Sequence, residues 1–303
     1  MAPGVVTLEH VTKRYGSVVA LDDVSLSIEA GEVVALLGPN GAGKTTAISI
    51  MLGLRRATSG VARLFGRAPT DLRARSRCGV MLQDSGTPEL LSVAEIVKLF
   101  GTYYPRPLPA EEALRLAGVQ ELGGTRLDRL SGGQRQRLFF ALAVVGDPEV
   151  LFLDEPTVGM DVEGRRTFLA AIRQRVRDGT TIVLTTHYLE EADQLADRIV
   201  VFNRGVMIAD APPAAIKSQV AGKRLTMRFG SAVDATMFTG APVTGLRTDG
   251  STAWMLSPRP VDVLRHVLAR RDDLIDVDVG GANLEEAFVS LTRDARDVGL
   301  AGA

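Results

Sequence analysis

Apolar residues in the first 220 positions fall into short continuous runs and longer runs with helical spacing. The continuous runs predict buried strands of a parallel sheet over Val33–Leu37, Val80–Leu82, Val150–Leu153 and Thr180–Leu184. The spaced runs predict helices over Thr45–Leu54, Ala110–Leu116 and Glu163–Arg177, and further helices that begin near Ser92 and Arg135. Strands that alternate with helices are typical of an α/β fold.

Shorter β segments flank this alternation. Val5–His10 and Val24–Ile28 are predicted strands that precede the first buried run. Near residue 200, two apolar segments flank Asn203-Arg-Gly205, which is a sequence typical of a β-hairpin turn.

The pattern changes after Pro212-Pro213, and we expect a domain boundary near residue 220. The first predicted domain therefore covers residues 1–220, with a helix-rich segment over about 85–147, and the second covers 221–303. The second domain is a small α+β domain with predicted strands Leu225–Phe229, Ala253–Leu256 and Ile275–Val279, and predicted helices Val261–Arg270 and Leu284–Leu291.

Composition narrows the class of protein. The 303 residues are 46% hydrophobic and 23% charged with a net charge of -1, which favours a soluble globular protein and argues against general attraction to nucleic acid. The longest purely apolar run, Leu138–Val145, is far shorter than the roughly 20 residues that a membrane-spanning helix needs. The N-terminus lacks an export signal and Cys78 is the single cysteine, so we expect a cytoplasmic protein without a disulfide.

A glycine-rich loop over residues 38–46 predicts a nucleotide triphosphate site. Its sequence fits G-x-x-x-x-G-K-[ST] between a predicted strand and a predicted helix. In this motif the glycines let backbone N–H groups face the phosphates, Lys44 reaches the β- and γ-phosphate oxygens, and the Thr45 hydroxyl can bind Mg²⁺. The candidate nucleotide contacts are Gly38, Asn40, Gly41, Gly43, Lys44, Thr45 and Thr46.

Two carboxylates end the buried run that begins at Val150. Asp154 can hold Mg²⁺ beside the glycine loop, and Glu155 can orient and deprotonate the attacking water. The start of a helix can bind an anion, because free backbone N–H groups and the positive end of the helix dipole meet there. Further candidates for a phosphate site therefore lie at the start of the helix predicted near Arg135. They are Ser131, Gly132, Gly133 and Gln134. A second cradle for phosphate is useful if it serves a nucleotide held by another subunit.

These motifs together resemble the ATP-binding cassette (ABC) family over about residues 4–220. The resemblance implies that Tyr15 stacks on adenine, that Gln83 lies near Mg²⁺ and the membrane partner, and that His187 is the switch histidine at the γ-phosphate. It also assigns Asp161 to the acidic position after the catalytic strand. The loop Val158-Gly-Met-Asp161 departs from the usual Ser-Gly-Leu-Asp of the family, and we expect activity to survive this change.

The fold that the resemblance implies is a P-loop NTPase core with an antiparallel β subdomain and an inserted helical subdomain. It implies a head-to-tail dimer in which Lys44 and Glu155 of one chain and Ser131–Gly133 of the other enclose each ATP with its Mg²⁺. A separate integral membrane permease would dock on the helical segment, which places the protein at the inner face of the cell membrane.

The C-terminal segment ending in residues 284–292 resembles the tail of bacterial exporter ATPases of the daunorubicin-resistance type, which implies drug or antibiotic efflux. A non-transport ABC ATPase that acts on ribosomes or DNA is the alternative, although such proteins generally carry two cassettes or long coiled coils. A P-loop kinase or GTPase switch would have no use for the turn at residues 131–134. We expect no nucleic acid partner.

Overall fold

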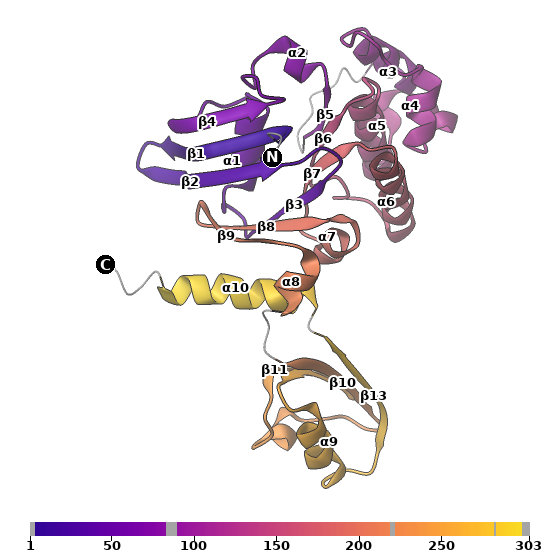
Figure 1. Ribbon diagram of the computed structural model, residues 1–303. Helices are drawn as coiled ribbons and strands as arrows, with labels where there is room; N and C mark the ends of the chain where they lie inside the picture. Colours follow the sequence, from indigo (N-terminus) through magenta and orange to yellow (C-terminus); the bar gives the residue numbers. More distant parts are fainter. Residues whose placement is uncertain (1–3, 83–89, 219–221, 282, 299–303) are drawn as a thin grey trace. The chain divides into compact units, whose positions relative to one another are not determined.

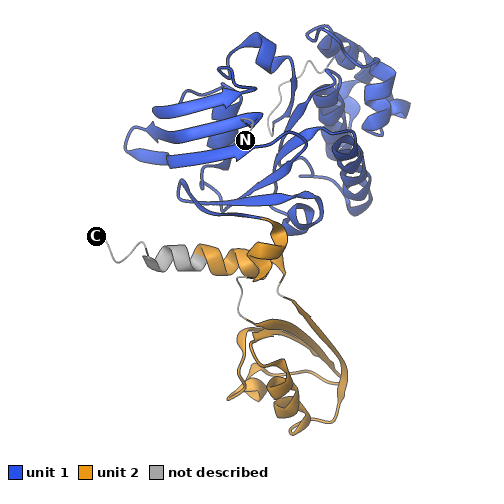
Figure 2. Ribbon diagram, in the orientation of Figure 1, with its two compact units in different colours: residues 1–211 blue, residues 212–303 orange. Residues whose placement is uncertain are grey.

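The structure is a computed structural model that describes residues 4–298 except 83–89, 219–221 and 282. The chain forms two compact units, residues 1–211 and 212–303 (Figure 2). The division falls at Pro212 rather than near residue 220, because the short helix α8 (Pro213–Ser218) packs against the last helix of the second unit.

A six-stranded sheet forms the centre of the first unit, with the strand order β5-β6-β7-β3-β8-β9 (Figure 1). Its strands are β3 (Val33–Leu37), β5 (Cys78–Met81), β6 (Val150–Asp154), β7 (Thr181–Thr185), β8 (Arg198–Asn203) and β9 (Val206–Ala211). All pairs are parallel except β8 with β9. Every residue of β3, β6 and β7 is buried, which explains their continuous apolar sequences and confirms the predicted α/β class.

Outside the helical segment, the first unit contains the helices α1 (Lys44–Met51), α2 (Leu72–Arg75), α6 (Val162–Arg177) and α7 (Leu189–Leu195). The predicted hairpin is confirmed between β8 and β9. Arg204 and Gly205 have φ angles of 49° and 83°, the positive values that a two-residue hairpin turn of this kind requires.

A second, antiparallel sheet in the first unit has the order β2-β1-β4. Its strands are β1 (Val6–Tyr15), β2 (Val18–Ile28) and β4 (Ser59–Leu64). The predicted strands at 5–10 and 24–28 were too short. The pairing of β1 with β2 shifts register after Leu8, and His10 and Asp23 have positive φ angles, so irregularities interrupt the alternation on which the prediction relied.

The helical segment contains α3 (Val93–Gly101), α4 (Ala110–Leu116), two short 3₁₀ turns, Gln120–Leu122 and Leu127–Arg129, and α5 (Gly132–Val144). The three α-helices pack against one another. The helix predicted to begin near Ser92 is α3, and Ser92 and Glu95 form its capping box, in which each side chain accepts a hydrogen bond from the other residue's backbone N–H. The segment thus folds as a helical subdomain, as the α/β class with an inserted helical part predicts.

The second unit is built on a four-stranded antiparallel sheet with the order β11-β12-β10-β13. It contains β10 (Lys223–Phe229), the 3₁₀ turn Ala235–Phe238, β11 (Thr244–Asp249), β12 (Thr252–Ser257), α9 (Pro260–Leu268), β13 (Leu274–Gly281) and α10 (Leu284–Val298). Its core includes Met227, Phe229, Phe238 and Val263. Strand β11 was missed because its sequence is polar and lies at the sheet edge. Across residues 4–82, 90–218, 222–281 and 283–298, none of the helices combines the length and apolar composition that crossing a membrane requires.

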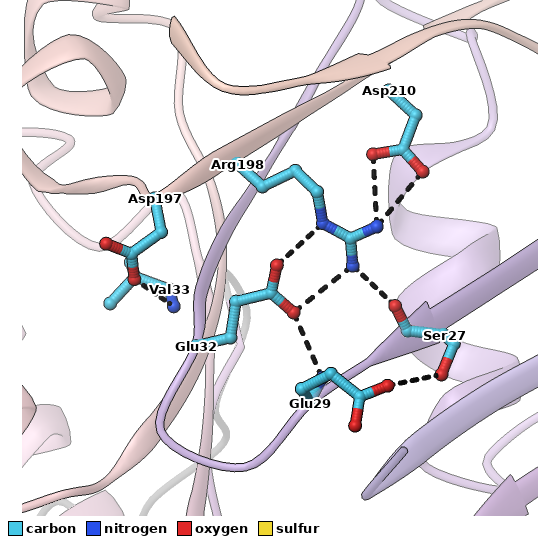
Figure 3. A network of polar contacts seen from close by, with 7 residues as sticks. All are labelled: Ser27, Glu29, Glu32, Val33, Asp197, Arg198 and Asp210. Atoms are coloured by element: carbon cyan, nitrogen blue, oxygen red, sulfur yellow. Dashed lines mark hydrogen bonds and ion pairs between the residues drawn. The ribbon is translucent and has the colours of Figure 1, made fainter. Parts of the chain in front are cut away.

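A network of charged groups joins the two sheets of the first unit (Figure 3). The guanidinium of Arg198 on β8 donates to both oxygens of Glu32, at 2.7 and 3.2 Å, and to both oxygens of Asp210, at 3.2 and 3.1 Å. It also donates to the backbone oxygen of Ser27 on β2. Burial raises the pKa of the Asp210 carboxyl above its ordinary value, and the charge of Arg198 opposes this shift.

Backbone groups near this network are held by carboxylates as well. The Glu29 N–H donates to Glu32 at 3.0 Å, and the Val33 N–H donates to Asp197 at 2.9 Å (Figure 3). The first residue of β3, the strand that leads into the glycine loop, is therefore held in place by a hydrogen bond to Asp197.

We expect Arg198→Ala to lower the free energy of unfolding by about 3 kcal/mol, because it removes the positive charge that pairs with two partly buried carboxylates, Glu32 and Asp210. Urea unfolding measured on the full chain tests this value. Arg73→Ala is the matched control: Arg73 is an exposed arginine, and its loss should change the free energy by less than about 0.5 kcal/mol. Equal effects of the two substitutions would contradict the role of the network.

Candidate active site

Three adjacent parallel strands, β6, β7 and β3, carry the predicted catalytic residues. Because the carboxyl ends of parallel strands meet at one edge of a sheet, the loops that follow them lie together. These loops hold residues 38–43 after β3, Glu155 after β6 and His187 after β7. The sheet thereby joins segments that are more than a hundred residues apart in the sequence.

The glycine loop between β3 and α1 depends on backbone conformations that only glycine adopts easily. Gly38, Gly41 and Gly43 have φ angles of 155°, 77° and 109°. A Cβ atom on Gly43 would lie 2.5 Å from the backbone oxygen of Ala20 and 2.8 Å from a methyl group of Leu21, whereas nothing lies within 4 Å of such an atom on Gly41. The loop is therefore packed tightly on β2 at one glycine and open at another.

Lys44, the first residue of α1, is buried and turns back onto the loop. Its Nζ donates to the backbone oxygens of Gly38 at 2.6 Å and Pro39 at 3.2 Å. Burial lowers the pKa of the Lys44 ammonium below its ordinary value, while the charges of Glu155 and Asp154 oppose that shift. The predicted lysine and both predicted carboxylates thus belong to one electrostatic cluster.

Asp154 ends β6 and is buried between two hydroxyl groups. Thr45 Oγ1 lies 3.5 Å from Asp154 Oδ2, and Thr185 Oγ1 donates to Asp154 Oδ1 at 2.5 Å. A hydroxyl and a carboxylate at this spacing are hard oxygen donors of the kind that Mg²⁺ takes, so the residues present fit that ion. The described residues contain no cluster of three or more His, Cys, Asp or Glu side chains that could hold a metal ion.

Glu155 and His187, predicted from separate segments, are in direct contact. His187 Nε2 lies 2.5 Å from Glu155 Oε1, and the Glu155 side chain is 11% exposed against 45% for His187. Glu155 has a φ of 52°, and its N–H donates to both the backbone oxygen and the hydroxyl of Thr185, at 3.1 and 3.0 Å. The Glu155 backbone is therefore strained and fixed by Thr185, and its carboxylate is less exposed than the imidazole that it contacts.

The other predicted nucleotide contacts lie on β1, in the glycine loop and on α1. Tyr15, at the end of β1, is 43% exposed, and the ammonium of Lys13 lies 4.9 Å from its ring centroid. Asn40 is exposed and Thr46 is half-buried within α1. Gln83 lies outside the described residues.

The Ser131–Gln134 turn starts α5, and Ser131 is its N-cap. The Ser131 N–H donates to Gln134 Oε1 at 2.9 Å and the Gln134 N–H donates to Ser131 Oγ at 3.3 Å, which forms a capping box. The predicted helix started too late, at Arg135, because the first two residues of α5 are glycines, which have low helix propensity. A Cβ on Gly133 would meet Met160 at 3.7 Å, so the turn lies beside residues 159–160 of its own chain.

Asp161, the predicted acidic position, is the N-cap of α6. Its Oδ1 accepts a hydrogen bond from the Gly164 N–H at 2.7 Å. The side chain is thus oriented by the helix it caps.

Sequence patterns missed four polar residues that build this site. They are the buried Thr157, Thr185, Thr186 and Glu191. Their only sequence feature is proximity to Glu155 and His187, and a threonine at the end of an apolar run is ordinarily read as part of the strand.

The fold and the site together define a P-loop nucleoside triphosphatase. The family model of the ABC transporter matches residues 21–158. The chain is 34% identical to daunorubicin resistance ATP-binding protein DrrA3 of Streptomyces coeruleorubidus, over 98% of this chain and 99% of that protein. It is also 34% identical to Nod factor export ATP-binding protein I of Paraburkholderia xenovorans, over 98% of this chain and 100% of that protein.

Among solved structures, the dimeric structure of MJ0796, a bacterial ABC transporter cassette, matches with a TM-score of 0.63 and 28% identity, over 68% of this chain and 98% of that one. A post-hydrolysis state of the same cassette bound to ADP and Pi matches with a TM-score of 0.62 and 27% identity, over 68% of this chain and 98% of that one. The chain belongs to the ABC transporter family as an ATP-binding subunit. It binds ATP and hydrolyses it.

We expect Gly43→Ala to lower the free energy of unfolding and ATP affinity far more than Gly41→Ala. Both substitutions place alanine at a positive φ, which costs about 1–2 kcal/mol, but only the Cβ at residue 43 collides with backbone. Thermal unfolding and nucleotide titration of the two variants measure the difference. Similar losses in both variants would contradict the tight packing of the loop on β2.

Proposed function

We propose that this protein is the ATPase subunit of an exporter and powers a separate membrane permease for the efflux of drugs or antibiotics. The observation that carries the catalytic part is the contact of Glu155 with His187 at 2.5 Å, next to the buried Lys44 and Asp154. These groups occupy the edge where parallel strands present a ligand site.

Each side chain has a distinct role in the proposed mechanism. Lys44 leaves its loop carbonyls to neutralise the β- and γ-phosphates, since a phosphate oxygen is a stronger acceptor than the two carbonyls it now holds. Glu155 takes the proton of the attacking water, and His187 contacts the γ-phosphate and holds the geometry of Glu155. Thr45 and Asp154, with Gln83 as a further ligand, would hold Mg²⁺, which neutralises charge on the phosphates when bound.

Several features support a head-to-tail dimer. The Ser131–Gly133 turn presents a helix N-terminus, and Ser131 and Gly132 are exposed. In the proposed dimer this turn caps the γ-phosphate of ATP bound to the other chain, and Tyr15 stacks on the adenine. In the proposed dimer Asp161 is expected near the same interface. Val158, which stands where the family usually has serine, is 37% exposed and cannot donate a hydrogen bond across it.

Relatives that match both units of this chain support export as the process that ATP hydrolysis drives. Relatives that match both units include one named for daunorubicin resistance and one named for Nod factor export. A second daunorubicin resistance ATP-binding protein, DrrA2 of Streptomyces coeruleorubidus, is 41% identical over 73% of this chain and 70% of that protein. We therefore place the protein at the inner face of the cell membrane with a permease, and we favour efflux of drug-like compounds.

Glu155→Gln should reduce ATP turnover by a factor of about 10²–10⁴ while ATP binding persists, because only the proton acceptor is lost. Phosphate release and nucleotide titration measure the two effects.

In cells that contain the permease, the same variant should raise intracellular daunorubicin to the level of cells without the ATPase. Glu163→Gln, at an exposed position of α6, is the control. Unchanged ATP turnover in Glu155→Gln would contradict the role of Glu155 as proton acceptor. If the native ATPase and permease together leave intracellular daunorubicin as high as in cells without the ATPase, efflux of this drug is contradicted.

Lys44→Ala should weaken ATP binding by about tenfold to a hundredfold, because it removes charge-assisted hydrogen bonds to the phosphates. Nucleotide titration tests this, with Lys98→Ala on the exposed face of α3 as the control for loss of a lysine. An ATP affinity equal to that of the native protein would contradict the proposed contact.

A further inference from the structure

Glu191 on α7 is a buried carboxylate that the proposed mechanism does not use. It is 3% exposed, and each of its two oxygens accepts one hydrogen bond. Thr157 Oγ1 donates to Oε1 at 2.7 Å, and Thr186 Oγ1 donates to Oε2 at 2.8 Å. Both hydroxyls are themselves buried, so water does not compete for them.

The two threonines belong to the loops that carry the catalytic pair. Thr157 follows Glu155 by two residues after β6, and Thr186 directly precedes His187 after β7. One carboxylate therefore connects the same two loops that Glu155 and His187 connect through their own contact at 2.5 Å.

The charge of Glu191 is balanced within the same cluster. Arg165 Nε on α6 lies 3.5 Å from Glu191 Oε1, and the Arg165 guanidinium lies 3.6 Å from the ring centroid of Tyr188, the residue after His187. The Tyr188 N–H also donates to Thr186 Oγ1 at 2.9 Å. A buried carboxylate is costly unless it is paired and hydrogen-bonded, and this one is both.

We propose that Glu191 is a positioning residue of the ATPase: through Thr157 and Thr186 it fixes the distance between Glu155 and His187. The inference rests on the proposed roles of those two residues. A displacement of about 1 Å in the position of a catalytic group can lower the rate about a hundredfold. Glu191 can therefore affect ATP turnover without contacting ATP, because it holds both loops that carry the catalytic pair.

Thr186→Val against Thr186→Ser is the cleanest test. Valine keeps the shape of threonine but loses the hydroxyl, whereas serine keeps the hydroxyl. We expect Thr186→Val to lower kcat about tenfold with little change in ATP affinity or melting temperature, and Thr186→Ser to stay near the native kcat. Glu191→Ala should lower kcat more, by up to about a hundredfold, with Glu191→Gln between Ala and the native protein because one acceptor oxygen remains. Glu190→Ala, an exposed neighbour on α7, is the control.

A double-mutant cycle separates positioning from a purely structural effect. If Thr186 acts through His187, Thr186→Val should cause no further loss of kcat in the His187→Ala variant. A full tenfold loss in that background, or a fall in ATP affinity and stability that parallels the fall in kcat, would overturn the inference. Native turnover in His187→Ala alone would instead contradict the proposed function of His187, so the two failures are distinguishable.

Discussion

Parallel pairing of β6, β7 and β3 is the constraint on which the active site depends. In this pairing Asp154 lies opposite Thr185, and Thr185 lies opposite Leu36, two residues before Gly38. A shift of one residue in the β6–β7 ladder would turn Asp154 to the opposite face of the sheet and away from Thr45, and the same shift in the β7–β3 ladder would displace the glycine loop. The register of these three strands therefore determines that the glycine loop, Asp154, Glu155 and His187 lie together.

Burial of charge is possible at this edge because Lys44, Asp154 and Glu191 each have partners among the described residues. Lys44 has loop carbonyls and two carboxylates nearby, Asp154 has two hydroxyls, and Glu191 has two hydroxyls and Arg165. The same principle applies at the junction of the two sheets, where Arg198 is held by carboxylates and a backbone oxygen (Figure 3). Polar groups that are satisfied in this way fix a single arrangement of the loops.

Much of the fold was predictable because local patterns agreed with tertiary structure. The strand at 33–37, the helix at 110–116 and the hairpin at 203–205 were identified from apolar runs and turn residues. The predictions were incomplete where a strand has an irregular pairing or a polar sequence. The pairing of β1 and β2 is interrupted near His10 and Asp23, and β11 is an edge strand with a polar sequence.

The sequence by itself determined the chemistry of the site, because a glycine loop with lysine and threonine, and an apolar strand with two acids, have few uses other than binding a triphosphate. It also predicted Glu155 from the acidic end of the strand, whereas His187 was predicted only from the resemblance to the ABC family. Only the tertiary structure decided that these two touch, and that Thr185, Thr157, Thr186 and Glu191 hold them in place. The physical reason is that these contacts link strand ends about 30 residues apart through buried hydroxyls, and a hydroxyl in the sequence does not reveal whether its partner is water, backbone or a distant carboxylate.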